Sequence, residues 1–124
     1  MKKIKGIGGV FFKSKDPKAM KEWYRTNLGL DVGEYGATFE WTDAPAACKN
    51  GSTTWNLFSE STKYLEPSNK NFMINYIVED LEGLFESLKK NGVTICDEIA
   101  SYDYGKFLHI MDPEGNKIEL WEPA

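Results

Sequence analysis

The chain has few of the residues on which several common protein chemistries depend. It has one histidine and two cysteines, and its 15 Lys and Arg are outnumbered by 19 Asp and Glu, for a net charge of −4. A phosphate-binding face needs clustered Lys and Arg, so this balance argues against nucleic acid as a partner. Cys48 and Cys96 form no CxxC motif, so neither a zinc knuckle nor a disulfide framework is indicated.

Long apolar runs are also missing. No apolar stretch approaches the roughly 20 residues that a membrane-spanning helix requires. The basic residues Lys2, Lys3 and Lys5 lead into a strand pattern rather than into the apolar core of a signal peptide. We therefore expect a soluble, cytoplasmic protein without a membrane partner, and 124 residues suit a single domain over 1–124.

What the chain does contain is one local pattern used twice. In each half an apolar stretch is followed by an Asp that can cap a helix, an amphipathic segment and a closing Gly. The capping Asp16 and the closing Gly29 are 13 residues apart, and Asp80 and Gly92 are 12 residues apart. This repetition indicates two structural modules of the same kind.

The first half reads as a strand, a helix and three further strands. Pro17 fits the first turn of the helix, where its missing N–H costs nothing. The apolar face of that helix comprises Met20, Trp23, Tyr24 and Leu28, which we expect to pack against the sheet. The expected strands cover 7–13, 31–35, 37–42 and 53–59, with an exposed loop over 43–52.

The second half repeats this order after a polar linker over 61–71. We expect a strand over 72–78, a helix over 81–91, and strands over 93–100, 106–111 and 117–122. A tight turn is predicted between the last two strands, at Asp112–Asn116, because Pro fixes φ while Gly and Asn accept positive φ. The fold class is therefore α+β: two βαβββ modules, 1–60 and 72–124, form a curved mixed sheet around a groove.

Strand alternation predicts which side chains line that groove. If Ile118 and Leu120 pack under the second helix, Glu119 and Trp121 face the groove. The same rule turns further residues inward: Ile7, Gly9, Phe11, Lys13, Met73, Asn75, Ile77, Phe107, His109 and Met111. For the strand over 53–59 we favour Asn56 inward. An apolar surround of Trp121, Phe11 and Met73 is expected to raise the pKa of Glu119.

Five stretches of the sequence resemble the vicinal oxygen chelate superfamily, also called the glyoxalase/bleomycin resistance/dioxygenase family. They are Gly9-Val-Phe-Phe-Lys-Ser-Lys-Asp-Pro with Glu22-Trp-Tyr and Asn27-Leu-Gly-Leu, then Tyr76-Ile-Val-Glu-Asp-Leu, and finally Asp112-Pro-Glu-Gly-Asn-Lys-Ile-Glu-Leu-Trp-Glu. The resemblance covers nearly the whole chain, and the last segment is its most specific part. It implies paired βαβββ modules and a homodimer.

The resemblance also implies where a metal ion would be bound in metal-dependent members. Three of the four matching positions are Gly9, Met73 and Asn56, which are unsuitable as ligands, and only Glu119 matches. His109 falls at a non-ligand position. We therefore predict no catalytic metal and no cofactor. The alternative is a hard cation held weakly by Glu119 with the amide oxygens of Asn56 and Asn75.

The leading hypothesis is a protein that binds a small organic molecule without a metal. Its candidate ligand-binding residues are Phe11, Trp41, Asn56, Met73, Asn75, Phe107 and Trp121. One alternative is a metal-independent isomerase or lyase with Glu119 as general base and His109 assisting. Another is a divalent-metal-dependent enzyme like lactoylglutathione lyase with rearranged ligands.

Simpler roles for the same residues stay open. Glu119 and His109 can be structural hydrogen-bonding groups, and Trp41, Trp55 and Trp121 can be packing residues. The segment 97–105, with Tyr102 and Tyr104, can be a lid, a rim of the groove or a solvated loop.

Overall fold

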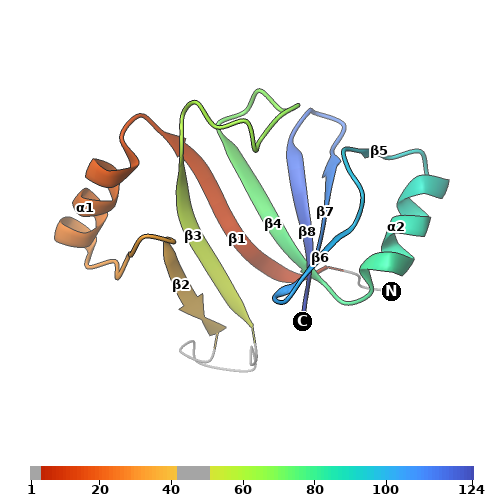
Figure 1. Ribbon diagram of the computed structural model, residues 1–124, viewed down its shortest axis with the longest axis horizontal. Helices are drawn as coiled ribbons and strands as arrows, with labels where there is room; N and C mark the ends of the chain where they lie inside the picture. Colours follow the sequence, from red (N-terminus) through yellow and green to blue (C-terminus); the bar gives the residue numbers. More distant parts are fainter. Residues whose placement is uncertain (1–3, 42–50) are drawn as a thin grey trace.

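The computed structural model describes residues 4–41 and 51–124, which form two helices and one mixed sheet (Figure 1). In chain order the elements are β1 (Ile4–Ser14), α1 (Pro17–Leu28), β2 (Ala37–Glu40), β3 (Ser52–Ser59), β4 (Phe72–Val78), α2 (Leu81–Lys90), β5 (Thr94–Ile95), β6 (Ala100–Tyr102), β7 (Gly105–Met111) and β8 (Lys117–Pro123). The two helices lie at opposite ends of the molecule with the strands between them (Figure 1). The expected α+β class is confirmed.

A single sheet runs through both halves of the chain. Its strand order is β2-β3-β1-β4-β8-β7-β5, with β6 paired to β7. In the first half β1 is parallel to β3, and in the second half β4 is parallel to β8, so the same arrangement occurs twice. The halves meet where β1 runs antiparallel to β4.

The predicted helix signals are confirmed at α1. The Asp16 carboxylate accepts a hydrogen bond from the backbone N–H of Ala19 at 3.1 Å, Pro17 occupies the first turn, and Gly29 ends the helix at φ 66°. The predicted turn before β8 is also present, because Gly115 has φ 83° and Asp112 N–H donates to Asn116 O at 3.0 Å.

The apolar core is concentrated in the second half. Val78, Leu81, Leu108, Ile110 and Leu120 form one buried cluster between α2 and the sheet. By contrast, α1 contains no buried residue. The expectation that its apolar face is packed is therefore only partly correct: Tyr24 contacts Trp55 with ring centroids 4.8 Å apart and the rings tilted at 59°, but Trp23 and Leu28 are 52% and 65% exposed.

Two of the expected strands differ from the structure. No strand forms over 31–35; Gly33 and Gly36 make only an isolated bridge, because Gly36 turns the chain at φ 94°. The expected strand over 93–100 is divided into the short β5 and β6, which both pair with β7. In the first half β2 ends at Glu40, and residues 42–50 of the expected strand and loop lie outside the described part.

Irregularities in β1 change which of its residues face the groove. The register against β4 shifts between Ile7 and Gly9. A Cβ added at Gly8 would meet Asn75 Oδ1 at 2.3 Å, so Gly8 faces the groove as Gly9 and Phe11 do. Simple alternation placed Ile7 inward, which is wrong because the bulge adds one residue; Ile7 is 45% exposed.

Within the described residues, no helix is long and apolar enough to cross a membrane.

Candidate functional site

A cavity of about 730 Å³ lies on the groove side of the sheet, and we call it the aromatic cavity. It is lined by Phe11, Phe58, Thr62, Tyr64, Asp97, Ala100, Tyr102, Tyr104, Phe107, His109 and Glu119. Four separate parts of the chain contribute: β1, the end of β3 with the connection that follows it, the segment 97–104, and the β7–β8 hairpin.

Aromatic rings form two walls of the cavity. On one wall Phe11 and Phe58 stack with ring centroids 5.5 Å apart and an interplanar angle of 13°. On the other, Tyr102 and Tyr104 stack at 5.3 Å and 6°, and both contact Phe107 edge-on. Such walls offer large flat apolar surfaces with electron-rich faces.

Glu119 lies at the base of the cavity and is 4% exposed. Its Oε2 atom accepts a hydrogen bond from the Tyr64 hydroxyl at 2.5 Å and lies 2.7 Å from His109 Nε2. Its Oε1 atom accepts a hydrogen bond from Asn75 Nδ2 at 2.8 Å. Three side chains from three different segments thus fix this carboxylate in place.

His109 lies directly opposite Glu119 on the neighbouring strand, between two carboxylates. Its Nδ1 atom is 2.6 Å from Asp97 Oδ2, and its backbone N–H donates to Asp97 Oδ1 at 2.9 Å. When the imidazole is protonated, both ring N–H groups donate to a carboxylate. Tyr64, Glu119, His109 and Asp97 therefore form a continuous chain of hydrogen-bonding groups.

The protonation states follow from these contacts. Burial by itself would raise the pKa of Glu119, but hydrogen bonds from His109, Tyr64 and Asn75 outweigh burial and hold that pKa below its ordinary value. Burial would lower the pKa of His109, but its hydrogen bonds to Glu119 and Asp97 outweigh burial and raise that pKa. The expectation that apolar surroundings raise the Glu119 pKa is therefore wrong.

Tyr64 is a neutral hydrogen-bond donor in this cluster. Burial and the adjacent Glu119 carboxylate raise the pKa of its hydroxyl. Lys117 Nζ donates to the Tyr64 carbonyl at 2.5 Å and lies 5.1 Å from the centroid of its ring. These contacts hold Tyr64 over Glu119, although the residue is 45% exposed overall.

Of the residues selected from the sequence, Phe11, Phe107, His109 and Glu119 line the aromatic cavity. Asn75 is buried behind Glu119, and its Oδ1 atom has no hydrogen-bond partner within the described residues.

The other four do not line the aromatic cavity, although Trp121 stacks on the lining residue Phe107 with ring centroids 5.9 Å apart. Met73 is fully buried and does not line the cavity. Asn56 shares a face with Phe11, but its Oδ1 atom accepts a hydrogen bond from Leu57 N–H and it lines no part of the cavity. Trp41 and Trp121 line a separate cavity of about 440 Å³.

Seven lining residues were not selected from the sequence as site residues: Phe58, Thr62, Tyr64, Asp97, Ala100, Tyr102 and Tyr104. The last four belong to the segment 97–105, for which a rim or a lid of the groove was one of the open interpretations. Tyr64 lies in the segment taken as a linker, where Tyr64 and Leu65 are the two large apolar residues of an otherwise polar stretch. Leu65 is 1% exposed, so this segment is anchored on the sheet. An aromatic–aliphatic pair in a polar connection was the signal available for Tyr64.

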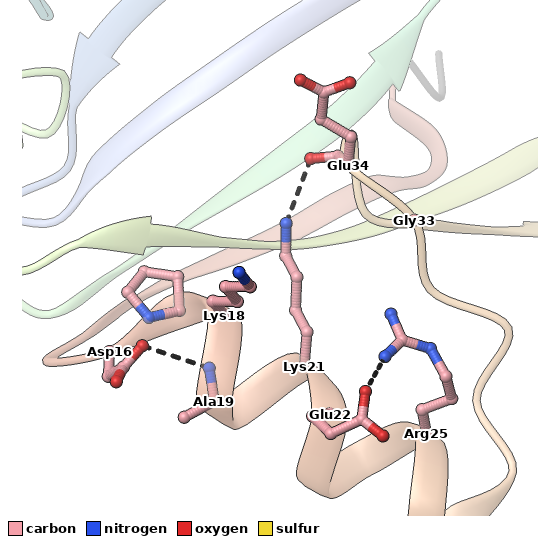
Figure 2. Close-up of a pocket in the computed structure, with 9 residues that line it drawn as sticks. Asp16, Lys18, Ala19, Lys21, Glu22, Arg25, Gly33 and Glu34 are labelled. Atoms are coloured by element: carbon pink, nitrogen blue, oxygen red, sulfur yellow. Dashed lines mark hydrogen bonds and ion pairs between the residues drawn. The ribbon is translucent and has the colours of Figure 1, made fainter.

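A second depression, of about 780 Å³, lies between α1 and the turn at 33–36 (Figure 2). Three of its charged side chains have partners: Lys21 Nζ donates to Glu34 O at 3.1 Å, and Arg25 pairs with Glu22. The Asp16 carboxylate caps the helix. Figure 2 shows the contacts of Asp16 with Ala19, of Lys21 with Glu34 and of Glu22 with Arg25, and the Lys21 contact ties the connection after α1 to the helix.

The aromatic cavity does not fit a divalent transition metal. Within residues 4–41 and 51–124, no three His, Cys, Asp or Glu side chains are placed to hold a metal ion together. Gly9 on β1 pairs with Asn75 on β4, and Asn75 pairs with Glu119 on β8. The residue of β4 beside Glu119 is therefore Asn75, whereas the sequence comparison had placed Met73 at this ligand position. An amide and a glycine supply too few donors.

A family model for the Glyoxalase/Bleomycin resistance protein/Dioxygenase superfamily matches residues 6–120. The chain belongs to this superfamily. It is 25% identical over 122 residues to the uncharacterized protein YetH of Bacillus subtilis (strain 168), covering 96% of this chain and 99% of YetH.

Solved structures share the fold of this superfamily member at low sequence identity. Methylmalonyl-CoA epimerase of Mycobacterium tuberculosis has a TM-score of 0.62 at 22% identity, covering 98% of this chain and 89% of that one. A superfamily member from Vibrio splendidus 12B01 has a TM-score of 0.57 at 15% identity, covering 94% and 97% of the two chains.

Proposed function

We propose that this protein binds a small organic molecule in the aromatic cavity without a metal. The observation that carries the proposal is the combination of two aromatic walls with a fixed carboxylate at their base. A cavity of this size, mainly apolar with a few oriented polar groups, suits a small-molecule ligand.

The state of Glu119 favours binding over base catalysis. A general base works best when its pKa is near the working pH, whereas three hydrogen bonds hold the pKa of Glu119 below its ordinary value. Both oxygens of this carboxylate already accept hydrogen bonds. Such a group provides fixed negative charge and is a poor proton acceptor.

Native mass spectrometry of protein purified from its host tests this proposal. We expect a small organic molecule retained at one per chain, with no stoichiometric metal. Replacing Phe107 by Leu should weaken retention, and replacing the exposed Phe39 by Leu is the matched control. Equal retention by the two variants would contradict binding in the aromatic cavity.

A second candidate function is a metal-independent isomerase or lyase with Glu119 as base. It is favoured by the chain of hydrogen-bonding groups from Tyr64 through Glu119 and His109 to Asp97, along which a proton is readily passed. For this candidate, Glu119→Gln should abolish turnover while most ligand binding persists. Turnover that survives the substitution would eliminate Glu119 as the base.

We also propose a homodimer, for which the exposed apolar side chains of α1 offer a contact. Trp23, Leu28 and Met20 are 52%, 65% and 39% exposed. Light scattering after size exclusion should give twice the chain mass of 14.1 kDa. Trp23→Lys should shift the mass toward the monomer, and a mass of one chain for the unmodified protein would contradict the dimer.

A further inference from the structure

We infer that the ligand of the aromatic cavity is a flat organic cation. This inference rests on the function proposed above and adds the chemical class of the ligand. It follows from two independent features of the cavity, the sign of its charges and the arrangement of its rings.

The charges that line the cavity are negative overall. Glu119 and Asp97 are carboxylates, and the one opposing charge is that of His109, which lies between them. No Lys or Arg is among the described residues that line the cavity. The His109 ring nitrogens already face Glu119 and Asp97, and Lys117 Nζ donates to the Tyr64 carbonyl. An anionic ligand would therefore lose its hydration without an unpaired cation in the lining to replace it, whereas a cationic ligand would be attracted.

Asp97 is the group best placed to contact such a ligand. The Glu119 side chain is 6% exposed and its oxygens are occupied, while the Asp97 side chain is 44% exposed. Each Asp97 oxygen accepts one hydrogen bond from His109, and a carboxylate oxygen has a second acceptor site. The exposed edge of Asp97 can thus accept hydrogen bonds from a cation in the cavity.

The rings favour the same class of ligand. The stacked pair Tyr102 and Tyr104 is 55% and 61% exposed and adjoins Phe107. Ring faces attract cations through their quadrupole, and flat ligands gain contact area by stacking on them. The opposite wall of Phe11 and Phe58 provides a second set of rings.

Two matched series of compounds test the charge preference directly. Benzamidine, benzamide and benzoate share one ring and differ in charge, as do tryptamine, indole-3-acetamide and indole-3-acetate. Calorimetric titration at pH 7 and low salt should give a dissociation constant at least tenfold lower for each cation than for its neutral amide, with the anion weakest. Amide resonances of Ala100 and His109 should shift on titration, because both residues line the cavity.

Substitutions then locate the source of the preference. Asp97→Asn keeps the shape of the side chain and should reduce the cation-to-amide ratio at least threefold. Glu34→Gln removes one negative charge from the depression beside α1 and should leave the ratio unchanged. Phe107→Leu should weaken the cation and the amide alike, because it removes ring surface and no charge.

The outcomes separate this inference from the proposed function. Binding of the amide or the anion as tightly as the cation would overturn the inference and leave small-molecule binding intact. Cation binding that shifts resonances beside α1 and not those of the cavity would also overturn it. If no compound of either series binds, the inference fails, and retention of a ligand in native mass spectrometry, lost in Phe107→Leu, then decides the proposed function separately.

Discussion

His109 and Glu119 face each other across neighbouring antiparallel strands, with Nε2 2.7 Å from Oε2, and both side chains are nearly buried. A buried charge is stabilised when it is paired and hydrogen-bonded, and here Asp97, Tyr64 and Asn75 supply the remaining hydrogen bonds. The imidazole can donate to both carboxylates at once only while it is protonated, and the pair is therefore most stable with a protonated imidazole and an ionised carboxylate.

This pairing predicts a maximum of stability in weakly acidic solution. The raised pKa of His109 contributes stability that is complete below its ordinary value of 6.5 and is lost as pH rises through the raised value. The lowered pKa of Glu119 contributes stability that is complete above its ordinary value of 4.5 and is lost as pH falls through the lowered value. The free energy of unfolding should therefore be highest between pH 4.5 and 6.5.

Urea denaturation across this pH range measures the effect. His109→Gln should remove most of the decline on the alkaline side, since the substituted residue does not titrate. An unchanged alkaline decline in this variant would show that another group is responsible.

The hydroxyl of Tyr64 should stabilise the site. Tyr64→Phe removes one of the three hydrogen bonds to Glu119, and we expect the free energy of unfolding to fall by about 1–2 kcal/mol. The pKa of Glu119 should rise, because a donor to its ionised form is lost, and nuclear magnetic resonance of the labelled carboxyl would report it. Tyr35→Phe is the matched control, since Tyr35 is 82% exposed, and equal effects would contradict the assignment.

The two helices should differ in how much they contribute to stability. Leu81 begins α2 and is fully buried in the core cluster, so Leu81→Ala should lower the free energy of unfolding by about 2–5 kcal/mol. Leu28 ends α1 and is 65% exposed, so Leu28→Ala should cost less than about 0.5 kcal/mol in the monomer. Thermal or urea unfolding at low protein concentration would compare them. If the two variants lost similar amounts of unfolding free energy, the apolar face of α1 would be buried against another surface in solution.

Metal removal should have no effect. The residues beside Glu119 do not form a transition-metal site, so treatment with a chelator should change neither the melting temperature nor ligand affinity. Elemental analysis of the purified protein should find Zn, Ni, Mn and Fe well below one ion per chain. A stoichiometric ion, lost together with activity or stability, would revive the metal-dependent alternative.

Much of the fold was predictable because its signals are local. Asp16, Pro17 and Gly29 determine the limits of α1 by capping and by the conformations that Pro and Gly favour. The absent strand over 31–35 was not predictable, because whether an extended segment joins a sheet depends on a partner strand elsewhere in the chain.

Part of the site was predictable for a similar reason. Alternation on β7 and β8 placed His109 and Glu119 on one face, and the hairpin between them made the two strands neighbours. The same rule gave the wrong face for Ile7 because of the bulge in β1. One inserted residue moves the side chains before it to the other face of the sheet.

By itself, the sequence determined the repeated module, the ends of the helices, and the acidic and imidazole groups that face the groove. These depend on periodicity and on the conformational preferences of single residues, which act over a few positions. Only the tertiary structure decided that Tyr64 and Asp97 join Glu119 and His109, and that the pKa of Glu119 falls. Those results depend on contacts between residues 12 to 55 positions apart, which no local pattern encodes.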